Sequence, residues 1–287
     1  MLTISYRNTI RLMRTFPVCP KPKAIGLSNI PADEPTIYVF NHVHARVEPL
    51  FLAMAAPSHP PIRFFIDFKV TRPELFSETQ RDVTNSVFSR RVQEKWGRHA
   101  LTRKMLEKVS NLLTRFMSAN LRGYNVIPVY VHDARTAEEQ AQRRRINRDA
   151  FIDCLRSLEN HVPVALAPSG GYTHQEATKS VVPTILPSLA EGLQKRGQTL
   201  KIVPSVVKER PQVCHGTYKK YIADRILPYR LCRLLLDRLK IKRYVPPRLT
   251  VEFLPPVTFA KRESTKEEKV QFVQELQQLI FDVLNRD

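Results

Sequence analysis

Four side chains that could take part in catalysis lie within seven residues of one another near the start of this chain. They are His42, His44, Arg46 and Glu48. A carboxylate that orients a histidine lets the imidazole take a proton from a hydroxyl group. Alternate histidines can instead bind zinc. Residues 42–48 are therefore the first candidate active site, and acid–base catalysis and metal binding are the two chemistries to weigh.

A second candidate stretch, Pro168 to His174, follows an apolar segment at 162–167. Ser169, Gly170 and Gly171 resemble the nucleophile elbow of serine hydrolases, in which a serine sits on a tight turn after a strand. His174 lies five residues after the serine, with no acid between them. The same residues also fit a simple glycine turn after a buried strand, so both interpretations stay open.

The elements that must position these stretches alternate between strand and helix patterns. The predicted strands are 36–40, 62–68, 126–131, 162–167, 200–207 and 249–254, and the predicted helices are 49–56, 78–120, 136–158, 184–195 and 264–285. Prolines make 17–35 irregular in this prediction. Alternation of this kind predicts an α/β fold with a mainly parallel central sheet flanked by helices, and function at the strand ends.

We expect a single domain with three segments. Residues 1–35 form an N-terminal amphipathic and irregular segment, 36–260 form the α/β domain, and 261–287 form a C-terminal helix. A basic amphipathic insertion at 208–248 interrupts the domain.

The charge of the chain favours anionic partners. There are 46 Lys and Arg against 27 Asp and Glu, which gives a net charge of +19. Such a field suits phospholipid headgroups, phosphorylated or CoA-linked substrates, or nucleic acid. No apolar run reaches the ~18–20 residues of a spanning helix. Residues 1–16 and 225–243 are basic and amphipathic. Segments of this kind lie on an anionic bilayer or pack against the domain with a solvated basic face, and both interpretations stay open. Together with the net charge they lead us to expect a membrane-associated protein, peripheral or interfacial, on the cytoplasmic side.

Four short blocks, taken in order, resemble the glycerophosphate acyltransferase (1-acylglycerol-3-phosphate acyltransferase-like) superfamily. The blocks are His42 to Pro49, Ile127 to Val131, Ala167 to His174, and Ile202 to Pro204. The spacing of five residues between His42 and Glu48 is similar to that of the glycerol-3-phosphate and dihydroxyacetone-phosphate acyltransferase subgroup. Three positions depart from the family pattern: Glu48 replaces Asp, Val131 replaces Arg and Ser169 replaces Glu.

The resemblance implies an enzyme that moves a fatty acyl group from acyl-CoA or acyl-carrier protein to a hydroxyl of a phosphorylated glycerol-type lipid precursor. It implies His42 as the general base and Glu48 as the acid that orients it. Substrate-binding roles would fall to His44, Arg46, Ser169, Gly170, Gly171 and His174. It implies neither a metal nor a cofactor, and it implies a membrane surface with anionic lipids as a partner.

Three other functions remain as alternatives. A catalytically silent lipid- or phosphate-binding module would use the same fold. A metal-dependent amidohydrolase would use His42 and His44, although Phe40 stands where that family usually has an aspartate. A serine hydrolase would use Ser169. Nucleic acid is not expected, because it would explain the charge but leave the histidine–acid stretch without a role.

Overall fold

The computed structural model describes residues 8, 10, 22–41, 48–56, 61–71, 104, 108, 111, 126–130, 134–168, 184–210, 248–261 and 263–286. Contacts divide the chain into two compact units. Unit 1 comprises residues 1–20, 67–126 and 211–247, and unit 2 comprises 21–66, 127–210 and 248–287. Most of the described residues belong to unit 2, which contains the sheet.

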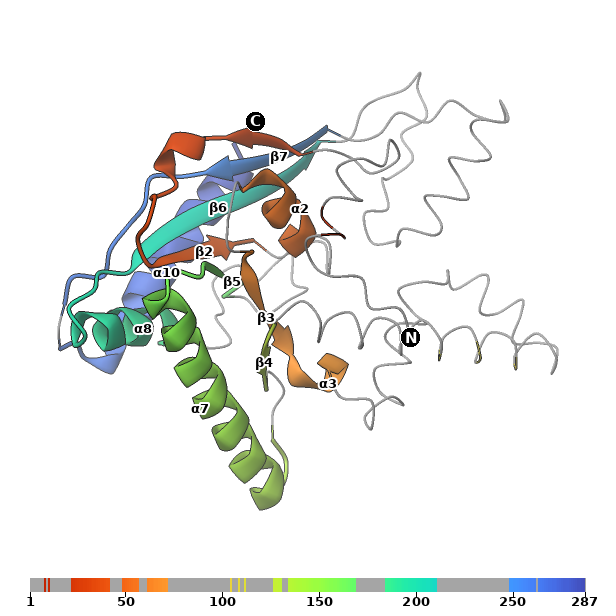
Figure 1. Cartoon of the computed structure of the whole chain (residues 1–287), viewed down its shortest axis with the longest axis vertical. Coiled ribbons are helices and arrows are strands. Elements are labelled where there is room, and N and C mark those ends of the chain that lie inside the picture. The colour runs from red at the N-terminus through yellow and green to blue at the C-terminus, as the bar shows by residue number, and fades with distance from the viewer. Residues whose placement is uncertain are drawn as a thin grey trace. The chain divides into compact units, whose positions relative to one another are not determined.

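Unit 2 is built on a seven-stranded sheet with the order β1-β7-β6-β2-β5-β3-β4 (Figure 1). The strands are β1 (Lys23–Ile25), β2 (Thr36–Phe40), β3 (Arg63–Asp67), β4 (Ile127–Val129), β5 (Val164–Leu166), β6 (Lys201–Arg210) and β7 (Arg248–Phe253). The pairs β1–β7, β6–β2, β2–β5 and β5–β3 are parallel, and β6–β7 is antiparallel. The predicted α/β fold with a mainly parallel sheet flanked by helices is confirmed.

Four of the helices lie close to where the sequence predicted them, whereas α3 (Phe68–Thr71) was not predicted and takes Phe68 from the strand expected at 62–68. They are α2 (Glu48–Ala55), α3 (Phe68–Thr71), α7 (Ala137–Glu159), α8 (Ile185–Gln194) and α10 (Lys266–Leu284). Most of the predicted helix at 78–120 lies outside the described residues. The segment between β6 and β7 is shorter than the insertion predicted at 208–248, since 208–210 belong to β6 and 248 belongs to β7.

The prediction that 17–35 is irregular is wrong for residues 23–29. Lys23–Ile25 forms β1, which pairs with β7, and Leu27–Asn29 forms a 3-10 helix, η1. Both belong to the same unit as the sheet and α10. The prolines of this region limit β1 to three residues but do not prevent pairing at the edge of the sheet, where one side of a strand needs no partner.

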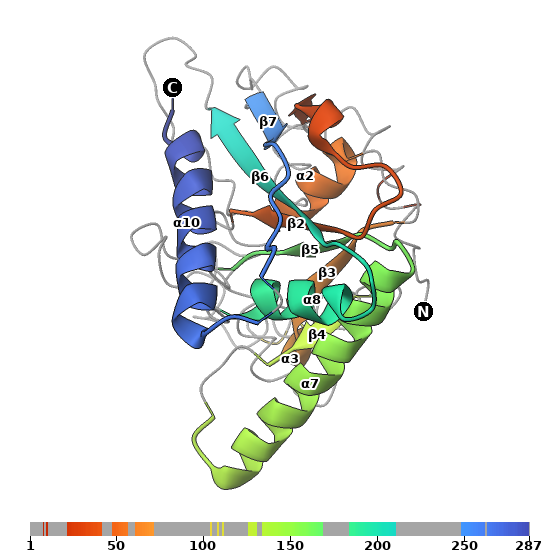
Figure 2. The ribbon, with the colours of Figure 1, turned by 90° about the vertical axis from the view of Figure 1, so that its left-hand side faces the viewer.

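β2 is the central strand of the sheet, and all five of its residues are buried. A continuous apolar run is typical of a parallel strand covered on both faces. Ile37 and Val39 join the core formed with α7, α8 and α10, whereas Tyr38 packs edge-on against Phe253 of β7. Figure 2 shows α7, α8 and α10 around the sheet, with α2 at a different face.

An ion pair fixes α7 to the sheet. The guanidinium of Arg63 on β3 donates two hydrogen bonds to the carboxylate of Asp153, both of 2.8 Å, and a third to Ser157. The backbone N–H of Arg63 also donates to Pro163, just before β5. Bidentate pairing of this kind sets direction as well as attraction. β3, β5 and the helix between β4 and β5 therefore form one connected block.

Candidate functional site

The candidate site lies where β2 and β5 end. The two strands are neighbours and run in parallel, with Tyr38 opposite Ala165 and Val39 opposite Leu166. The segment after Phe40 and the segment after Leu166 therefore leave the same edge of the sheet from adjacent strands. In parallel α/β sheets this carboxyl edge is the usual place for ligand binding.

Most of the predicted site residues lie outside the described part of the chain. These are His42, His44, Arg46, Ser169, Gly170, Gly171 and His174. Val131, where the family resemblance expects an arginine, lies outside it as well. The roles assigned to these residues stay predictions. What the structure places are the strands that lead into the two stretches and the helix that follows the first.

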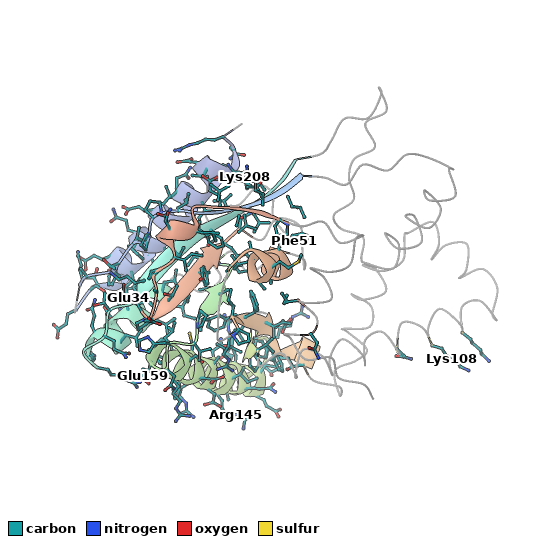
Figure 3. The ribbon with its side chains drawn as sticks, turned by 45° about the horizontal axis from the view of Figure 1, so that its top comes forward. Glu34, Phe51, Lys108, Arg145, Glu159 and Lys208 are labelled. Carbon is teal, nitrogen blue, oxygen red and sulfur yellow. The ribbon has the colours of Figure 1, made fainter. Side chains whose placement is uncertain are left out.

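Glu48 is the first residue of α2, directly after residues 42–47. Pro49 follows it, as expected for a first helical turn, in which the missing N–H costs no hydrogen bond. An acidic residue at this end is favoured by the helix dipole. Phe51 and Leu52 anchor the helix, with 4% and 0% of their surfaces exposed (Figure 3). The backbone of the predicted orienting acid is thus held by a buried helix.

Asn41, the residue before the predicted base, forms two hydrogen bonds with the backbone of β6. The side-chain amide of Asn41 donates to the carbonyl oxygen of Val207 at 3.0 Å and accepts from the N–H of Val207 at 2.7 Å. Sequence reasoning assigned no role to Asn41. Its position in the sequence, between an apolar strand and a histidine, could have indicated this role. An asparagine side chain both donates and accepts hydrogen bonds, so it can pair with the next strand just beyond the end of its own.

A second asparagine makes the same arrangement elsewhere in unit 2. Asn147 on α7 accepts from the N–H of Tyr130 at 2.7 Å and donates to its carbonyl oxygen at 3.1 Å. Tyr130 directly follows β4, which is the second of the four sequence blocks. The end of β4 is therefore fixed against α7, although the contact does not involve the predicted base.

Positive charge on α7 gathers in its middle. The side chains of Arg144, Arg145 and Arg148 are exposed, and Arg143 is half-buried; Arg145 is labelled on α7 in Figure 3. Arg148 forms an ion pair with Asp149, at 3.7 Å between exposed groups. An ion pair of this kind contributes little to stability. Exposed guanidinium groups such as those of Arg144 and Arg145 suit an anionic partner.

Two groups buried in unit 2 are held neutral by burial. Burial raises the pKa of the Tyr38 phenol to about 12. Burial also raises the pKa of the Cys154 thiol far above its ordinary value, an effect that the Arg63 guanidinium opposes and Asp153 reinforces. Both groups are therefore neutral near neutral pH.

Within the described residues, no cluster of three or more His, Cys, Asp or Glu side chains is placed to hold a metal ion. His42 and His44 are outside that part of the chain, so the amidohydrolase alternative is not tested by it. Among the helices that the structure describes, none is both long and apolar enough to cross a membrane.

Comparison with known proteins gives structural similarity but no sequence match. No protein-family model matches the chain, and no curated protein matches it. One similar solved structure is the 1-acyl-sn-glycerophosphate (LPA) acyltransferase PlsC from Thermotoga maritima. The identity is 13% and the TM-score 0.44, over 98% of this chain and 82% of that chain. A similarity of this size does not by itself identify a family or an activity.

Proposed function

We propose that this protein is an O-acyltransferase that moves a fatty acyl group from an acyl thioester to a hydroxyl of a phosphorylated glycerol-type lipid precursor. One observation supports it above the others. β2 and β5 are parallel neighbours, with Val39 opposite Leu166, so the strand ends that precede the His42 stretch and the Ser169 stretch lie next to each other at one edge of the sheet. These stretches are the first and third blocks of the acyltransferase resemblance.

In this mechanism His42 takes the proton of the acceptor hydroxyl while the oxygen attacks the thioester carbonyl carbon. The C–S bond then breaks, and the leaving thiolate takes the proton back from the imidazolium. Glu48 holds the imidazole in the tautomer that leaves one nitrogen free to accept. The donor, acyl-CoA or an acyl-carrier protein, is a substrate, so the reaction needs neither a metal nor a cofactor.

The acceptor phosphate would be bound by the second stretch. Glycines 170 and 171 let backbone N–H groups approach an anion closely, because no Cβ stands in the way. Ser169, His174, Arg46 and His44 would add hydrogen bonds or positive charge. Ser169 takes the place of a family glutamate and would offer the acceptor a hydroxyl group instead of a carboxylate.

Acyl transfer measured with labelled acyl-CoA and acyl-carrier protein tests the proposal, with glycerol 3-phosphate and a lysophosphatidate as acceptors. His42→Ala should lower kcat by about 100- to 10,000-fold, the usual contribution of a general base. His161→Asn is the matched control, since His161 is exposed at the end of α7 and its positive φ of 55° suits asparagine. Activity that survives His42→Ala overturns the mechanism.

Two substitutions at Glu48, to Asp and to Gln, distinguish the need for a carboxylate from the need for a side chain of this length. Glu48→Asp restores the usual family residue and should keep at least part of the activity, whereas Glu48→Gln should lose most of it. A wild-type protein that transfers no acyl group but still binds phosphorylated glycerol lipids would support the second candidate, a catalytically silent binding module on the same fold.

We propose a membrane surface rich in anionic lipids as the partner, with unit 1 carrying the attraction. Unit 1 has 24 Lys and Arg against 8 Asp and Glu, a net charge of +16, whereas unit 2 has 22 against 19, a net charge of +3. The unit that contains the sheet is therefore nearly neutral. Each basic residue near an anionic leaflet adds about 1 kcal/mol of attraction, so the partition of charge favours association through unit 1 on the cytoplasmic face.

Co-sedimentation with vesicles of phosphatidylcholine alone, or with added phosphatidylserine, tests this partner. Binding should need the anionic lipid and weaken as salt rises from 50 to 500 mM. Duplex DNA at matched salt is the comparison. Tighter binding to DNA than to the anionic vesicles would contradict the proposed partner without touching the acyl-transfer proposal.

A further inference from the structure

β6 continues past the point where its neighbour β2 stops. The last pair between the two strands is Phe40 with Ser205, and β6 runs on to Arg210. Alternate residues of a strand turn their backbone N–H and C=O groups to the same side. The backbone N–H of Lys201 donates to the carbonyl oxygen of Pro35, just before β2, so the polar groups of Lys201 point toward β2. The carbonyl oxygen of Pro204 accepts from the N–H of Leu254, just after β7, so the polar groups of Pro204 point toward β7.

By this alternation, Val207 turns its N–H and C=O toward β2 just beyond the last pair. The side chain of Asn41 meets both groups, at 2.7 Å and 3.0 Å. The amide thus takes the place that the backbone of a longer β2 would occupy. Without it, two polar groups at a half-buried edge would lose their partner, which costs more than the net gain of an average hydrogen bond.

Among common side chains of this length, only an amide carries one donor and one acceptor at the spacing that backbone pairing needs. An ionised aspartate can accept from the N–H of Val207 but would face its carbonyl oxygen with a second negative oxygen. Leucine has nearly the shape of asparagine but makes neither hydrogen bond. The chemistry of this contact therefore selects asparagine at position 41.

We propose that Asn41 is a positioning residue for the acyl transfer: its amide fastens the chain to β6 at the residue directly before His42, and so sets where the base leaves the sheet. This inference rests on the proposed function. Its physical basis is that an error of about 1 Å in placing a catalytic group can cost about 100-fold in rate. Asn41 is the residue directly before His42, so its hydrogen bonds to β6 hold the backbone one residue away from the predicted base.

The test compares Asn41→Leu with Asn147→Leu, because Asn147 makes the same pair of hydrogen bonds to Tyr130. Both variants lose two hydrogen bonds, so their melting temperatures should fall by similar amounts. Asn41→Leu should lower kcat at saturating substrates by about 100-fold with KM changed less than threefold. Asn147→Leu should leave kcat within threefold of wild type.

Asn41→Asp adds a readout that a purely structural role would not move. A protonated carboxyl group can donate to the Val207 carbonyl and accept from its N–H, as the amide does, whereas the carboxylate cannot. The kcat of Asn41→Asp, divided by that of wild type at the same pH, should therefore rise as the pH falls from 8 to 5. A ratio that stays flat would overturn the positioning role.

The outcomes separate this inference from the proposed function. If wild type is active and His42→Ala is not, but Asn41→Leu keeps its kcat, the acyl transfer stands and the positioning role of Asn41 is wrong. If wild type transfers no acyl group, the proposed function fails first. Equal losses of kcat in Asn41→Leu and Asn147→Leu also overturn the inference, since they would show only general destabilisation.

Discussion

Gly26 and Gly197 provide a matched test of backbone geometry, because both have a positive φ and only one is crowded. Gly26 has φ 72° and precedes η1, and Gly197 has φ 77° after α8. A Cβ on Gly26 would lie 2.2 Å from the carbonyl oxygen of Phe253, whereas a Cβ on Gly197 would meet nothing within 4 Å. Alanine at the two positions therefore differs only by the collision.

The size of the difference follows from three contributions. A non-glycine residue in the left-handed region costs about 1 kcal/mol, and this is the whole expected effect of Gly197→Ala. At Gly26 the chain must also open by about 1 Å to clear the oxygen. That movement endangers the hydrogen bond from Asn29 to the same Phe253 oxygen, 2.8 Å long, which adds about 1 kcal/mol. With the residual clash, we expect about 3 kcal/mol or more for Gly26→Ala.

Thermal unfolding followed by circular dichroism measures both. Since 1 kcal/mol shifts Tm by about 2–4 °C in domains of this size, Gly197→Ala should lower Tm by about that amount and Gly26→Ala by about 6–12 °C. Asparagine, which tolerates positive φ, should rescue position 197 but not 26. Equal shifts for the two alanine variants would refute the close approach of Gly26 to β7.

Three further predictions concern buried charge and a buried thiol. Asp153→Ala should lower the free energy of unfolding by about 3 kcal/mol in urea titrations, because the Arg63 guanidinium is only 10% exposed; replacing both residues, as Arg63→Met with Asp153→Leu, should recover most of that loss. Burial alone would raise the pKa of Glu191, but its hydrogen bonds with Lys269 and Ser264 hold that pKa below its ordinary value. Its contribution is therefore complete above the pKa of an unfolded glutamate, about 4.3, and is lost as the pH falls through the folded value. Glu191→Gln should therefore be less stable than wild type at pH 7, and this difference in stability should shrink as the pH falls below about 4.3. The Cys154 thiol, whose pKa burial raises, should resist alkylation at pH 8 until the protein unfolds, as peptide mass spectrometry would show.

Local patterns in the sequence were enough to predict most elements of the sheet unit. The run Thr36–Phe40 is apolar throughout, and the structure buries all of it as β2. Thr136 and Glu139 form a capping box at the start of α7, and Thr265 and Glu268 form another at the start of α10. Such signals lie within four residues of the element they begin, so a single sequence contains them.

What sequence reasoning missed depends on distant partners. β1 has three residues among prolines and no alternation, and it exists because Ala24 pairs with Val251 of β7. The role of Asn41 depends on Val207, which lies 166 residues away. Neither partner could be named before the order of strands was known. The candidate site was predicted from its residue types, whereas the contact of Asn41 with β6 could be recognised only from the sheet.

The two neighbours of β2 end at different points relative to the end of β2. On one side β6 continues as a strand from Val206 to Arg210 and pairs with β7. On the other side β5 ends at Leu166, and the glycine stretch follows. A continuing strand leaves its neighbour no room for a ligand, so we expect the acceptor phosphate on the β5 side. Gly170→Ala and Gly171→Ala should then raise KM for the phosphorylated acceptor by at least tenfold and leave KM for the thioester nearly unchanged. An increase in KM for the thioester alone would place the acceptor elsewhere.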